Sequence, residues 1–397
     1  MKALIWVRFW RAILKCLWKL PFKHVIYFGK QLGYENPHVH EGKVRVNTFF
    51  PPYPSAAFER FLDTTIKRAR VPFSTYFAVT DECPFKCGHC SYGNHKPGKL
   101  DIGRALHVIN EIKSLGTTTI GLTGGEPLLR HDLLDLVKAI GNDTASVIFT
   151  TGYNLTAELA ADLKKAGLDC LMIGIESDLA DEHDKIRGVK GSFEQTLDAI
   201  RISVAGGLYT GISTIATREK INEGALLRLA ELADRYGVHE FRILEPVPTG
   251  RLMSQAVEAL TIEESRQVAQ FHKQWNKKGK GVAIASFAHL ESDEMFGCGA
   301  GYHHLFIDAV GNVCPCDLTP LSFGNVFEEK LVNIWERMGR IFNTPRRGCF
   351  SKEICRKLVL KTGESLPLNN EQSVSICGLC EKTDLPMIYQ NLLKEPR

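Results

Sequence analysis

The sequence predicts a parallel α/β fold followed by a smaller, cysteine-rich domain. Between residues 73 and 250, six short apolar segments alternate with amphipathic segments of helical period, and parallel strands need such crossover helices. Seven of the twelve cysteines lie between positions 298 and 380, after this alternation has ended. A doubly wound sheet and a partial barrel both satisfy the strand count. Both place their chemistry at the carboxyl ends of the strands.

The first element is a basic segment over residues 1–34, which holds seven Lys or Arg and no acidic residue. On a helix over 3–20, the charges at positions 8, 11, 15 and 19 share one face, and apolar side chains with three tryptophans occupy the others. This pattern is typical of a helix lying in a membrane surface. The charges interrupt any apolar run long enough to cross one. We expect Pro21 to end the helix and the segment to bind an anionic membrane. The alternative is a helix packed on the barrel, as most amphipathic helices are.

The overall composition limits the class and the compartment. Hydrophobic residues at 44% and charged residues at 24% are ordinary values for a globular protein. Residues 1–34 carry a charge of +7, whereas the whole chain carries only +4. The rest of the chain is therefore slightly acidic, and nucleic-acid binding is not expected. Clustered cysteines without a readable signal peptide indicate metal ligands in a reducing compartment. We therefore expect a cytoplasmic protein, peripheral on the cytoplasmic face of a membrane if residues 1–34 bind there.

The elements that follow fall into a connector, the alternating region and the cysteine-rich region, with expected boundaries of 35–71, 72–290 and 291–397. Prolines at 51, 52 and 54 favour an extended, stiff surface linker in the connector. A helix near 262–278 precedes a β-like stretch at 305–308 and a turn at Gly311-Asn312. The expected strands are 75–80, 118–122, 146–150, 170–175, 209–215 and 241–244. The expected crossover helices lie near 102–115, 131–140, 156–166, 192–206 and 222–236.

Directly after the first strand, Cys83, Cys87 and Cys90 lie on one short loop. Three thiolates there can converge on a single metal centre. Structural zinc takes four ligands, so three cysteines leave one position open, as would a four-iron cluster with one open iron. His89 is an alternative fourth ligand for zinc, although its spacing from Cys87 strains that geometry.

A second motif follows the second strand, at Thr123-Gly124-Gly125-Glu126-Pro127. Two glycines at a strand end allow a ligand to approach the backbone closely. The acidic side chain offers a charge to an ammonium group. A tight strand-to-helix turn would explain the same residues without a ligand.

Together, the two motifs resemble those of the radical S-adenosylmethionine (SAM) superfamily, over residues 73–250. The resemblance implies a six-stranded partial (β/α) barrel in which Cys83, Cys87 and Cys90 hold a [4Fe-4S] cluster. It also implies that SAM chelates the fourth iron and that one electron cleaves it, giving a 5′-deoxyadenosyl radical that abstracts a substrate hydrogen. A flavodoxin or ferredoxin-type protein is the expected electron donor.

The resemblance also implies contacts to SAM. Gly124, Gly125 and Glu126 would meet the methionine amino group, and His89 lies where the family usually has an aromatic residue beside the adenine. Arg187 would pair with the methionine carboxylate, for which a guanidinium is well suited; alone, it would be a surface charge. The remaining candidates end the third and fourth strands: Thr151, a weaker one, and Glu176 and Ser177, of which the inward-pointing side chain stays open.

The C-terminal cysteines resemble the start of SPASM and twitch auxiliary-cluster domains. Cys298 precedes a β-like stretch, Gly311 makes its turn, and Cys316 follows five residues later. A full SPASM run is missing, so the shorter twitch pattern closed by Cys377 and Cys380 fits better. We expect one auxiliary [4Fe-4S] cluster on Cys298, Cys316, Cys377 and Cys380. A zinc knuckle at the closing pair is the alternative. Three cysteines are left without a role: Cys314, Cys349 and Cys355.

Three functions follow from these patterns. The first is a radical SAM enzyme acting at a membrane surface on an unidentified lipid, peptide or small molecule. The second is a soluble maturase of a ribosomally made peptide, although no peptide-recognition domain is readable in residues 1–71. The third is a non-catalytic iron–sulfur or zinc scaffold, which would not require an open three-cysteine site beside a glycine pair.

Overall fold

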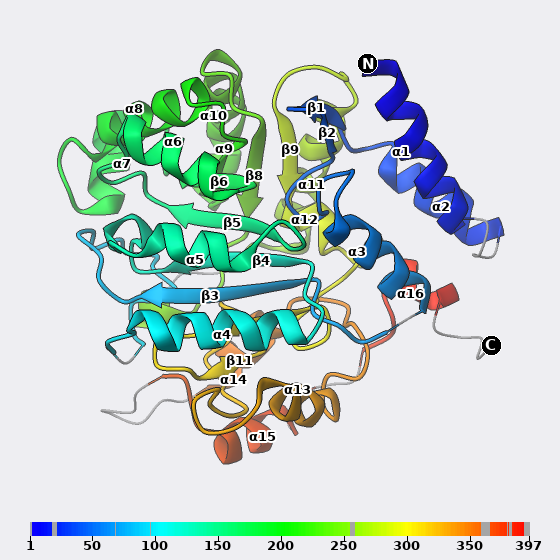
Figure 1. Ribbon diagram of the computed structural model, residues 1–397, viewed down its shortest axis with the longest axis vertical. Helices are drawn as coiled ribbons and strands as arrows, with labels where there is room; N and C mark the ends of the chain where they lie inside the picture. The colour runs from blue at the N-terminus through cyan, green and yellow to red at the C-terminus, as the bar shows by residue number, and fades with distance from the viewer. Residues whose placement is uncertain are drawn as a thin grey trace.

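The computed structural model describes residues 2–17, 22–67, 69–95, 97–254, 259–358, 366–378, 380 and 383–392. At its centre lies a sheet of nine strands in the order β11-β10-β3-β4-β5-β6-β7-β8-β9 (Figure 1). All six expected strands are present, and they are parallel to one another. They are β3 (Ser74–Thr80), β4 (Thr119–Gly124), β5 (Ala145–Thr150), β6 (Cys170–Gly174), β7 (Thr210–Ile215) and β8 (Glu240–Leu244).

Helices connect consecutive strands and bury their apolar stripes against the sheet. In α4 (Ile102–Ser114) the buried positions recur at steps of three and four residues, which defines one helix face. These positions are Ala105, Val108, Ile109 and Ile112. The other expected crossover helices are also present: α5 (Leu133–Ile140), α6 (Ala157–Ala166), α8 (Ser192–Ala205) and α10 (Ala225–Arg235). Two short helices were not expected from the sequence: α7 (Ala180–Arg187) and α9 (Arg218–Asn222). This alternation confirms the predicted partial barrel.

Two strands extend the sheet beyond the expected six. β9 (Ala283–Ser286) follows the expected helix α11 (Ile262–Asn276) and pairs in parallel with β8. At the opposite edge, β10 (His304–Ile307) pairs in parallel with β3 and in antiparallel fashion with β11 (Val313–Cys314). The expected turn at Gly311 joins β10 to β11, and its φ of 90° suits glycine. The cysteine-rich region is thus hydrogen-bonded to the barrel sheet.

The expectation of a stiff surface linker over 35–71 is wrong. This stretch forms the hairpin of β1 (His38–His40) and β2 (Lys43–Arg45), followed by α3 (Ala56–Lys67). Phe50, Phe58 and Phe61 are buried there in one apolar cluster. These phenylalanines, before and after the prolines, gain free energy from burial that an exposed linker could not supply.

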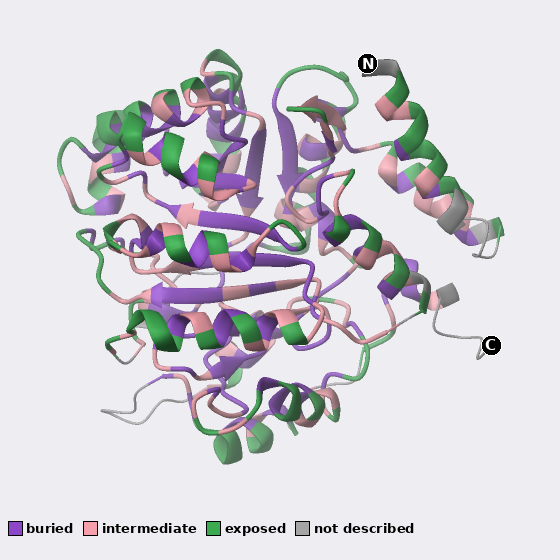
Figure 2. Ribbon diagram, viewed as in Figure 1, coloured by how far each residue is buried: buried purple, intermediate pink, exposed green. Residues whose placement is uncertain are grey.

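The N-terminal segment forms two helices, α1 (Lys2–Leu17) and α2 (Phe22–Leu32), of which α1 lies beside the β1–β2 hairpin (Figure 1) and α2 contacts α16 (Met387–Leu392). Phe9 is buried, with its ring centroid 5.6 Å from that of Tyr53 and 5.9 Å from that of Phe58. The outer side of α1 remains exposed (Figure 2). Trp18, Lys19 and the expected helix end at Pro21 lie outside the described residues. Among the described helices, none has the length and apolar composition needed to cross a membrane.

Candidate functional site

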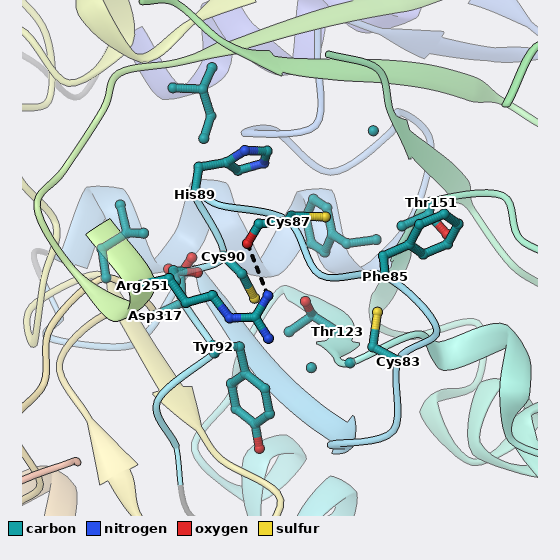
Figure 3. Close-up of a pocket in the computed structure, with 18 of the residues that line it drawn as sticks. Cys83, Phe85, Cys87, His89, Cys90, Tyr92, Thr123, Thr151, Arg251 and Asp317 are labelled. Carbon is teal, nitrogen blue, oxygen red and sulfur yellow. Dashed lines mark hydrogen bonds between the residues drawn. The ribbon is translucent and has the colours of Figure 1, made fainter. Parts of the chain in front are cut away.

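The three-cysteine loop lies at the carboxyl ends of the parallel strands. Cys83, Cys87 and Cys90 line one cavity of about 420 Å³ (Figure 3). Burial raises the pKa of Cys83 to about 11 and raises that of Cys90. These two thiols are therefore protonated at neutral pH, and a metal must displace their protons on binding. No other described cysteine lines this cavity.

The glycine pair at the end of β4 packs against the start of the cysteine loop. The amide of Gly125 donates to the Thr80 carbonyl at 2.7 Å, and that of Glu126 donates to the Glu82 carbonyl at 2.7 Å. A Cβ added to Gly124 would lie 2.2 Å from the oxygen of Thr80, and one added to Gly125 would lie 2.2 Å from that of Glu82. Only glycine therefore allows the two strand ends to approach in this way.

The side chain of Glu126 is fully buried and is held by the end of β5. One of its oxygens accepts hydrogen bonds from Thr150 Oγ1 at 2.5 Å and the amide of Leu128 at 3.0 Å. The other accepts from the amide and Oγ1 of Thr151, at 2.8 and 2.5 Å. Four donors fill the capacity of a carboxylate. It is the backbone of Gly124 and Gly125, and not the Glu126 side chain, that lines the cavity.

Glu176 is buried and lies among three basic side chains. Its carboxylate lies 2.8 Å from Arg187 Nη2, 3.3 Å from His89 Nε2 and 3.9 Å from Lys220 Nζ. Burial alone would raise the pKa of Glu176, but His89 and Arg187 hold it well below its ordinary value. The structure thus brings together three residues expected from the sequence and adds Lys220. Only the fold places Lys220, which follows β7, beside the end of β6.

The structure settles which side chain points inward after β6. Glu176 lines the cavity. Ser177 does not, because its Oγ donates to Glu182 Oε2 at 2.7 Å and accepts from the amide of Leu179 at 3.1 Å. Ser177 therefore stabilises the start of α7 instead of facing the cavity.

Arg251, which the sequence analysis missed, holds the cysteine loop from the other side of the cavity. Its Nη1 donates to the Cys87 carbonyl at 3.0 Å (Figure 3), and its amide donates to the Cys90 carbonyl at 3.0 Å. The preceding Gly250 has a φ of 54°, and a Cβ there would lie 2.3 Å from the Cys90 oxygen. A Gly-Arg pair after a strand is too short a signal to identify from sequence.

The auxiliary cysteines divide differently from the expectation. Cys298, Cys316 and Cys349 line a second cavity of about 110 Å³. A hydrogen bond between the thiols of Cys298 and Cys349 raises the pKa of Cys298 well above its ordinary value and lowers that of Cys349 to about 7. Cys377, at the end of α15 (Asn370–Cys377), and Cys380 do not line this cavity. The amide of Cys380 donates to the Cys377 carbonyl at 3.1 Å, so this pair forms its own turn.

Two C-terminal cysteines, Cys314 and Cys355, belong neither to this cavity nor to the pair Cys377 and Cys380. Cys314 is fully buried in a small apolar cluster with Ala78, Phe306 and Ala309. Burial raises the pKa of Cys355 to about 12, and its thiol contacts Thr249. Neither residue lines the cavity of Cys298, Cys316 and Cys349.

Asp317 links the two cavities and was also missed. It lines both the cavity of the three-cysteine loop and that of the auxiliary cysteines. His304 Nε2 lies 3.2 Å from its Oδ1, and Cys316 Sγ donates to the same oxygen at 3.4 Å. Asp317 directly follows Cys316, an expected cluster ligand, and this position is the one feature of the sequence that could have indicated a role for it.

A third set of metal-ligand residue types, Glu35, His272 and His289, is buried away from both cavities. The amide of Ser286 donates to His272 Nδ1 at 3.0 Å, which leaves the ring proton on Nε2. That nitrogen lies 3.3 Å from Glu35 Oε1, and neither of these two buried atoms makes a hydrogen bond of good geometry. The set brings Glu35 of the N-terminal region against His272 of α11 and His289, with the His289 Nε2 3.8 Å from Glu35 Oε1.

Two regions of the chain match known family models. Residues 77–233 match the model of the radical SAM superfamily. Residues 298–357 match the SPASM model, an iron-sulfur cluster-binding domain. The first match covers the cysteine loop and the glycine pair, and the second covers the hairpin with Cys298, Cys316 and Cys349.

Similar curated proteins carry several activities. The AdoMet-dependent heme synthase of Methanosarcina barkeri is 27% identical, over 80% of this chain and 90% of that protein. The mycofactocin maturase MftC of Mycobacterium ulcerans is 33% identical, over 62% of this chain and 68% of that protein. The sporulation killing factor maturation protein SkfB of Bacillus subtilis is 26% identical, over 66% of this chain and 65% of that protein.

Solved structures share the fold at low sequence identity. SuiB of Streptococcus suis bound to S-adenosylmethionine has a TM-score of 0.59 at 15% identity, over 73% of each chain. SuiB bound to the precursor peptide SuiA has a TM-score of 0.57 at 15% identity, over 85% of this chain and 77% of SuiB. These likenesses support the partial barrel and its C-terminal extension.

Proposed function

The chain belongs to the radical SAM superfamily, and on this premise we propose that it is an enzyme that abstracts a hydrogen atom from a peptide substrate at the mouth of its barrel. Its family gives it a [4Fe-4S] cluster, SAM and an auxiliary iron–sulfur cluster as cofactors. The substrate class, the individual ligands and the place of action are our proposals. Each rests on a separate observation.

The residues at the first cavity fit a cluster with an open iron. Cys83, Cys87 and Cys90 supply three thiolates there. His89 Nε2 lies 3.3 Å from Glu176, so this contact competes with zinc ligation by the same atom. When bound, the cluster and SAM supply the one-electron cleavage that gives a 5′-deoxyadenosyl radical.

The chain's own contribution is positioning and charge. We assign the backbone of Gly124 and Gly125 to the methionine moiety, and His89 to the adenine side. Glu126 orients the end of β5, because its carboxylate accepts hydrogen bonds from the hydroxyl groups of Thr150 and Thr151. Glu176, with Arg187 and Lys220, forms a buried polar wall at the cavity.

The observation that carries the peptide proposal is a large open groove that shares a lining residue with the cavity. A depression of about 900 Å³ runs between α11 and the auxiliary domain, and Glu245 lines both it and the cavity of the cysteine loop. The groove also reaches Cys298 and Cys349. An extended chain could lie in it with one residue directed to the radical site. The maturases among the relatives, and SuiB with its precursor peptide, support this choice.

For the auxiliary cluster, we propose Cys298, Cys316 and Cys349 as ligands, with the fourth thiolate from the pair Cys377 and Cys380. The addition of Cys349 rests on the cavity that it shares with the first two. The charge of Arg346 acts on both Cys377 and Cys380, and the Arg346 carbonyl accepts from the amide of Cys298 at 2.8 Å. The closing pair is thus near the cavity without lining it.

A second proposal concerns where the enzyme acts. We propose that α1 and α2 hold it on an anionic membrane surface, because they keep apolar side chains exposed on a segment without acidic residues. The exposed apolar residues are Leu4, Val7, Trp10, Leu14, Phe22 and Ile26.

The radical chemistry is tested with anaerobically reconstituted protein, dithionite and SAM. We expect release of 5′-deoxyadenosine. Replacing Cys83, Cys87 and Cys90 together by alanine should abolish it and remove about four irons. Unchanged cleavage in that variant would refute the assignment.

The substrate class is tested by adding probes to the same reaction. We expect synthetic peptides encoded by short reading frames beside the gene to raise 5′-deoxyadenosine release and to change in mass. An iron porphyrin serves as the competing probe, since some relatives are heme synthases. Stimulation and conversion of the porphyrin alone would overturn the peptide proposal and leave the radical chemistry intact.

A further inference from the structure

The central cysteine of the loop lies between two arginine side chains. Arg187 Nη1 donates a hydrogen bond to Cys87 Sγ with a donor–sulfur distance of 3.7 Å. Arg251 Nη1 donates to the carbonyl oxygen of the same residue at 3.0 Å. Cys87 and Arg187 are both buried, so water screens the charge of Arg187 at this sulfur only weakly.

Arg187 is fixed in this position by several contacts. Its Nη2 lies 2.8 Å from Glu176 Oε1, and a Cβ on Gly174 would lie 2.4 Å from the same nitrogen. Its carbonyl accepts from the amide of Lys86, within the cysteine loop, at 3.1 Å. Both the backbone and the side chain of Arg187 therefore hold the loop, and neither terminal nitrogen of the guanidinium is free of a partner.

We propose that Arg187 is a positioning residue for the cluster, which raises the reduction potential of the cluster by donating to the sulfur of Cys87. The inference rests on the proposed [4Fe-4S] cluster at Cys83, Cys87 and Cys90. Reduction adds one electron to a cluster that already carries thiolate charge, and hydrogen bonds to the sulfurs favour that more negative state. This role differs from the pairing with a methionine carboxylate that the sequence resemblance implies.

Glu176 opposes this effect. Its carboxylate lies against the nitrogen of Arg187 that does not face Cys87, and it cancels part of the positive charge. Removing Arg187 should therefore make the cluster harder to reduce, and removing the charge of Glu176 should make it easier. A general structural perturbation of the site would not shift the reduction potential in opposite directions in these two variants.

The test is a redox titration of the reconstituted protein without SAM, monitored by the electron paramagnetic resonance signal of the reduced cluster. In Arg187→Gln, the ratio of reduced to oxidised cluster at a given potential should fall about tenfold, or about 59 mV for one electron. Arg187→Lys keeps the charge and should restore part of the loss. Glu176→Gln should shift the potential in the positive direction.

The matched control is Arg228→Gln. Arg228 pairs with Asp178 at 2.7 Å near the end of the same strand, but it does not contact Cys87. Its removal should leave the potential unchanged. If Arg187→Gln fails to retain iron, the other two variants test the proposal. It is supported if Glu176→Gln raises the reduction potential and Arg187→Lys lowers it slightly, and it is refuted if neither variant changes the potential.

The failures of the two proposals are distinguishable. A wild-type protein that holds no cluster at the three cysteines refutes the proposed function. A wild-type cluster whose potential is the same in Arg187→Gln refutes the present inference. If that variant instead weakens SAM binding at an unchanged potential, Arg187 serves the methionine carboxylate and not the cluster.

Discussion

Lys352 Nζ lies 2.9 Å from Glu245 Oε2, and this ion pair joins the auxiliary domain to the rim of the barrel. Glu245 directly follows β8, and its other oxygen accepts from Ser265. Lys352 belongs to α14 (Phe350–Lys357), which begins next to Cys349. The pair therefore fixes the side of the proposed peptide groove at the point where the groove meets the radical cavity.

Replacing Lys352 by methionine should lower the free energy of unfolding by about 1 kcal/mol, because the pair is mostly buried but Glu245 keeps Ser265 as a donor. The midpoint of urea unfolding of the reconstituted protein measures this change. Lys357→Met is the control, since Lys357 pairs with Glu353 on the more exposed side of the same helix. An equal effect of the two substitutions would contradict a special role for the Glu245 pair.

Gly125→Ala should displace the cysteine loop. The added methyl group would lie 2.2 Å from the Glu82 carbonyl oxygen, which is backbone and cannot move aside without shifting the loop. We expect loss of the iron at Cys83, Cys87 and Cys90, while the auxiliary iron is retained. Iron analysis and the spectrum of the reduced protein measure both. Gly29→Ala adds the same methyl group in open space on α2 and should change neither.

The auxiliary assignment predicts two groups of cysteine variants. Cys298→Ala, Cys316→Ala and Cys349→Ala should each reduce the auxiliary iron and leave the first cluster's signal, because these thiols share one cavity. Cys314→Ala and Cys355→Ala should retain it. If Cys349→Ala retained all auxiliary iron, Cys349 would not be a ligand, and the set expected from the sequence (Cys298, Cys316, Cys377 and Cys380) would be favoured.

The neutral imidazole of His303 should make the fold sensitive to acid. Burial lowers the pKa of His303 to about 3, and its ring stacks on Phe73 with centroids 4.0 Å apart. Between that pKa and the unfolded value of about 6.5, the unfolded chain binds a proton that the native chain does not, so stability falls as the pH falls. In His303→Gln, the dependence of unfolding free energy on pH between 6.5 and 5 should weaken by about one proton. An unchanged slope would contradict a neutral His303.

The local parts of this fold follow from the sequence because they depend on neighbours in the chain. The six buried strands are apolar runs, and the cysteine loop and glycine pair are spaced motifs directly after two of them. The long-range parts do not follow. β10 pairs with β3 across more than 200 residues, and the Ser74 hydroxyl meets His304 Nδ1 at 2.7 Å only after that pairing.

The same reason separates the site residues that sequence analysis found from those that it missed. Cys83 and Glu126 belong to recognisable spacings. Lys220, Arg251 and Asp317 are single residues after separate strands, and they reach the cavity or its charged wall only through the barrel. In residues 35–71 the prolines predict an extended path, but burial of Phe50, Phe58 and Phe61 determines the structure.

The last prediction concerns α1 at a membrane. The helix divides its apolar residues: Phe9 and Ile13 are buried on the protein, whereas Leu4, Val7, Trp10 and Leu14 are 46–58% exposed. Packing on the barrel therefore accounts for one stripe only. Arg8 and Arg11 are exposed beside the second stripe, where anionic head groups would attract them.

Truncation is a poor test of this surface, because Phe9 packs on Tyr53 and Phe58 and its loss would uncover the core. The double substitution Arg8→Gln/Arg11→Gln leaves that packing intact. Each basic residue near an anionic membrane is worth about 1 kcal/mol, so binding should weaken about 30-fold. Sedimentation with vesicles of graded anionic lipid measures it, and Lys138→Gln on the exposed side of α5 is the control. Pelleting that ignores lipid charge and salt, or that is equal in the double variant and the wild type, would show that the exposed stripe of α1 does not bind anionic lipid. Since attraction between exposed charges falls off over about 10 Å at 0.1 M salt, binding that survives only at low salt would identify basic side chains as its source, and the double variant tests the share of Arg8 and Arg11.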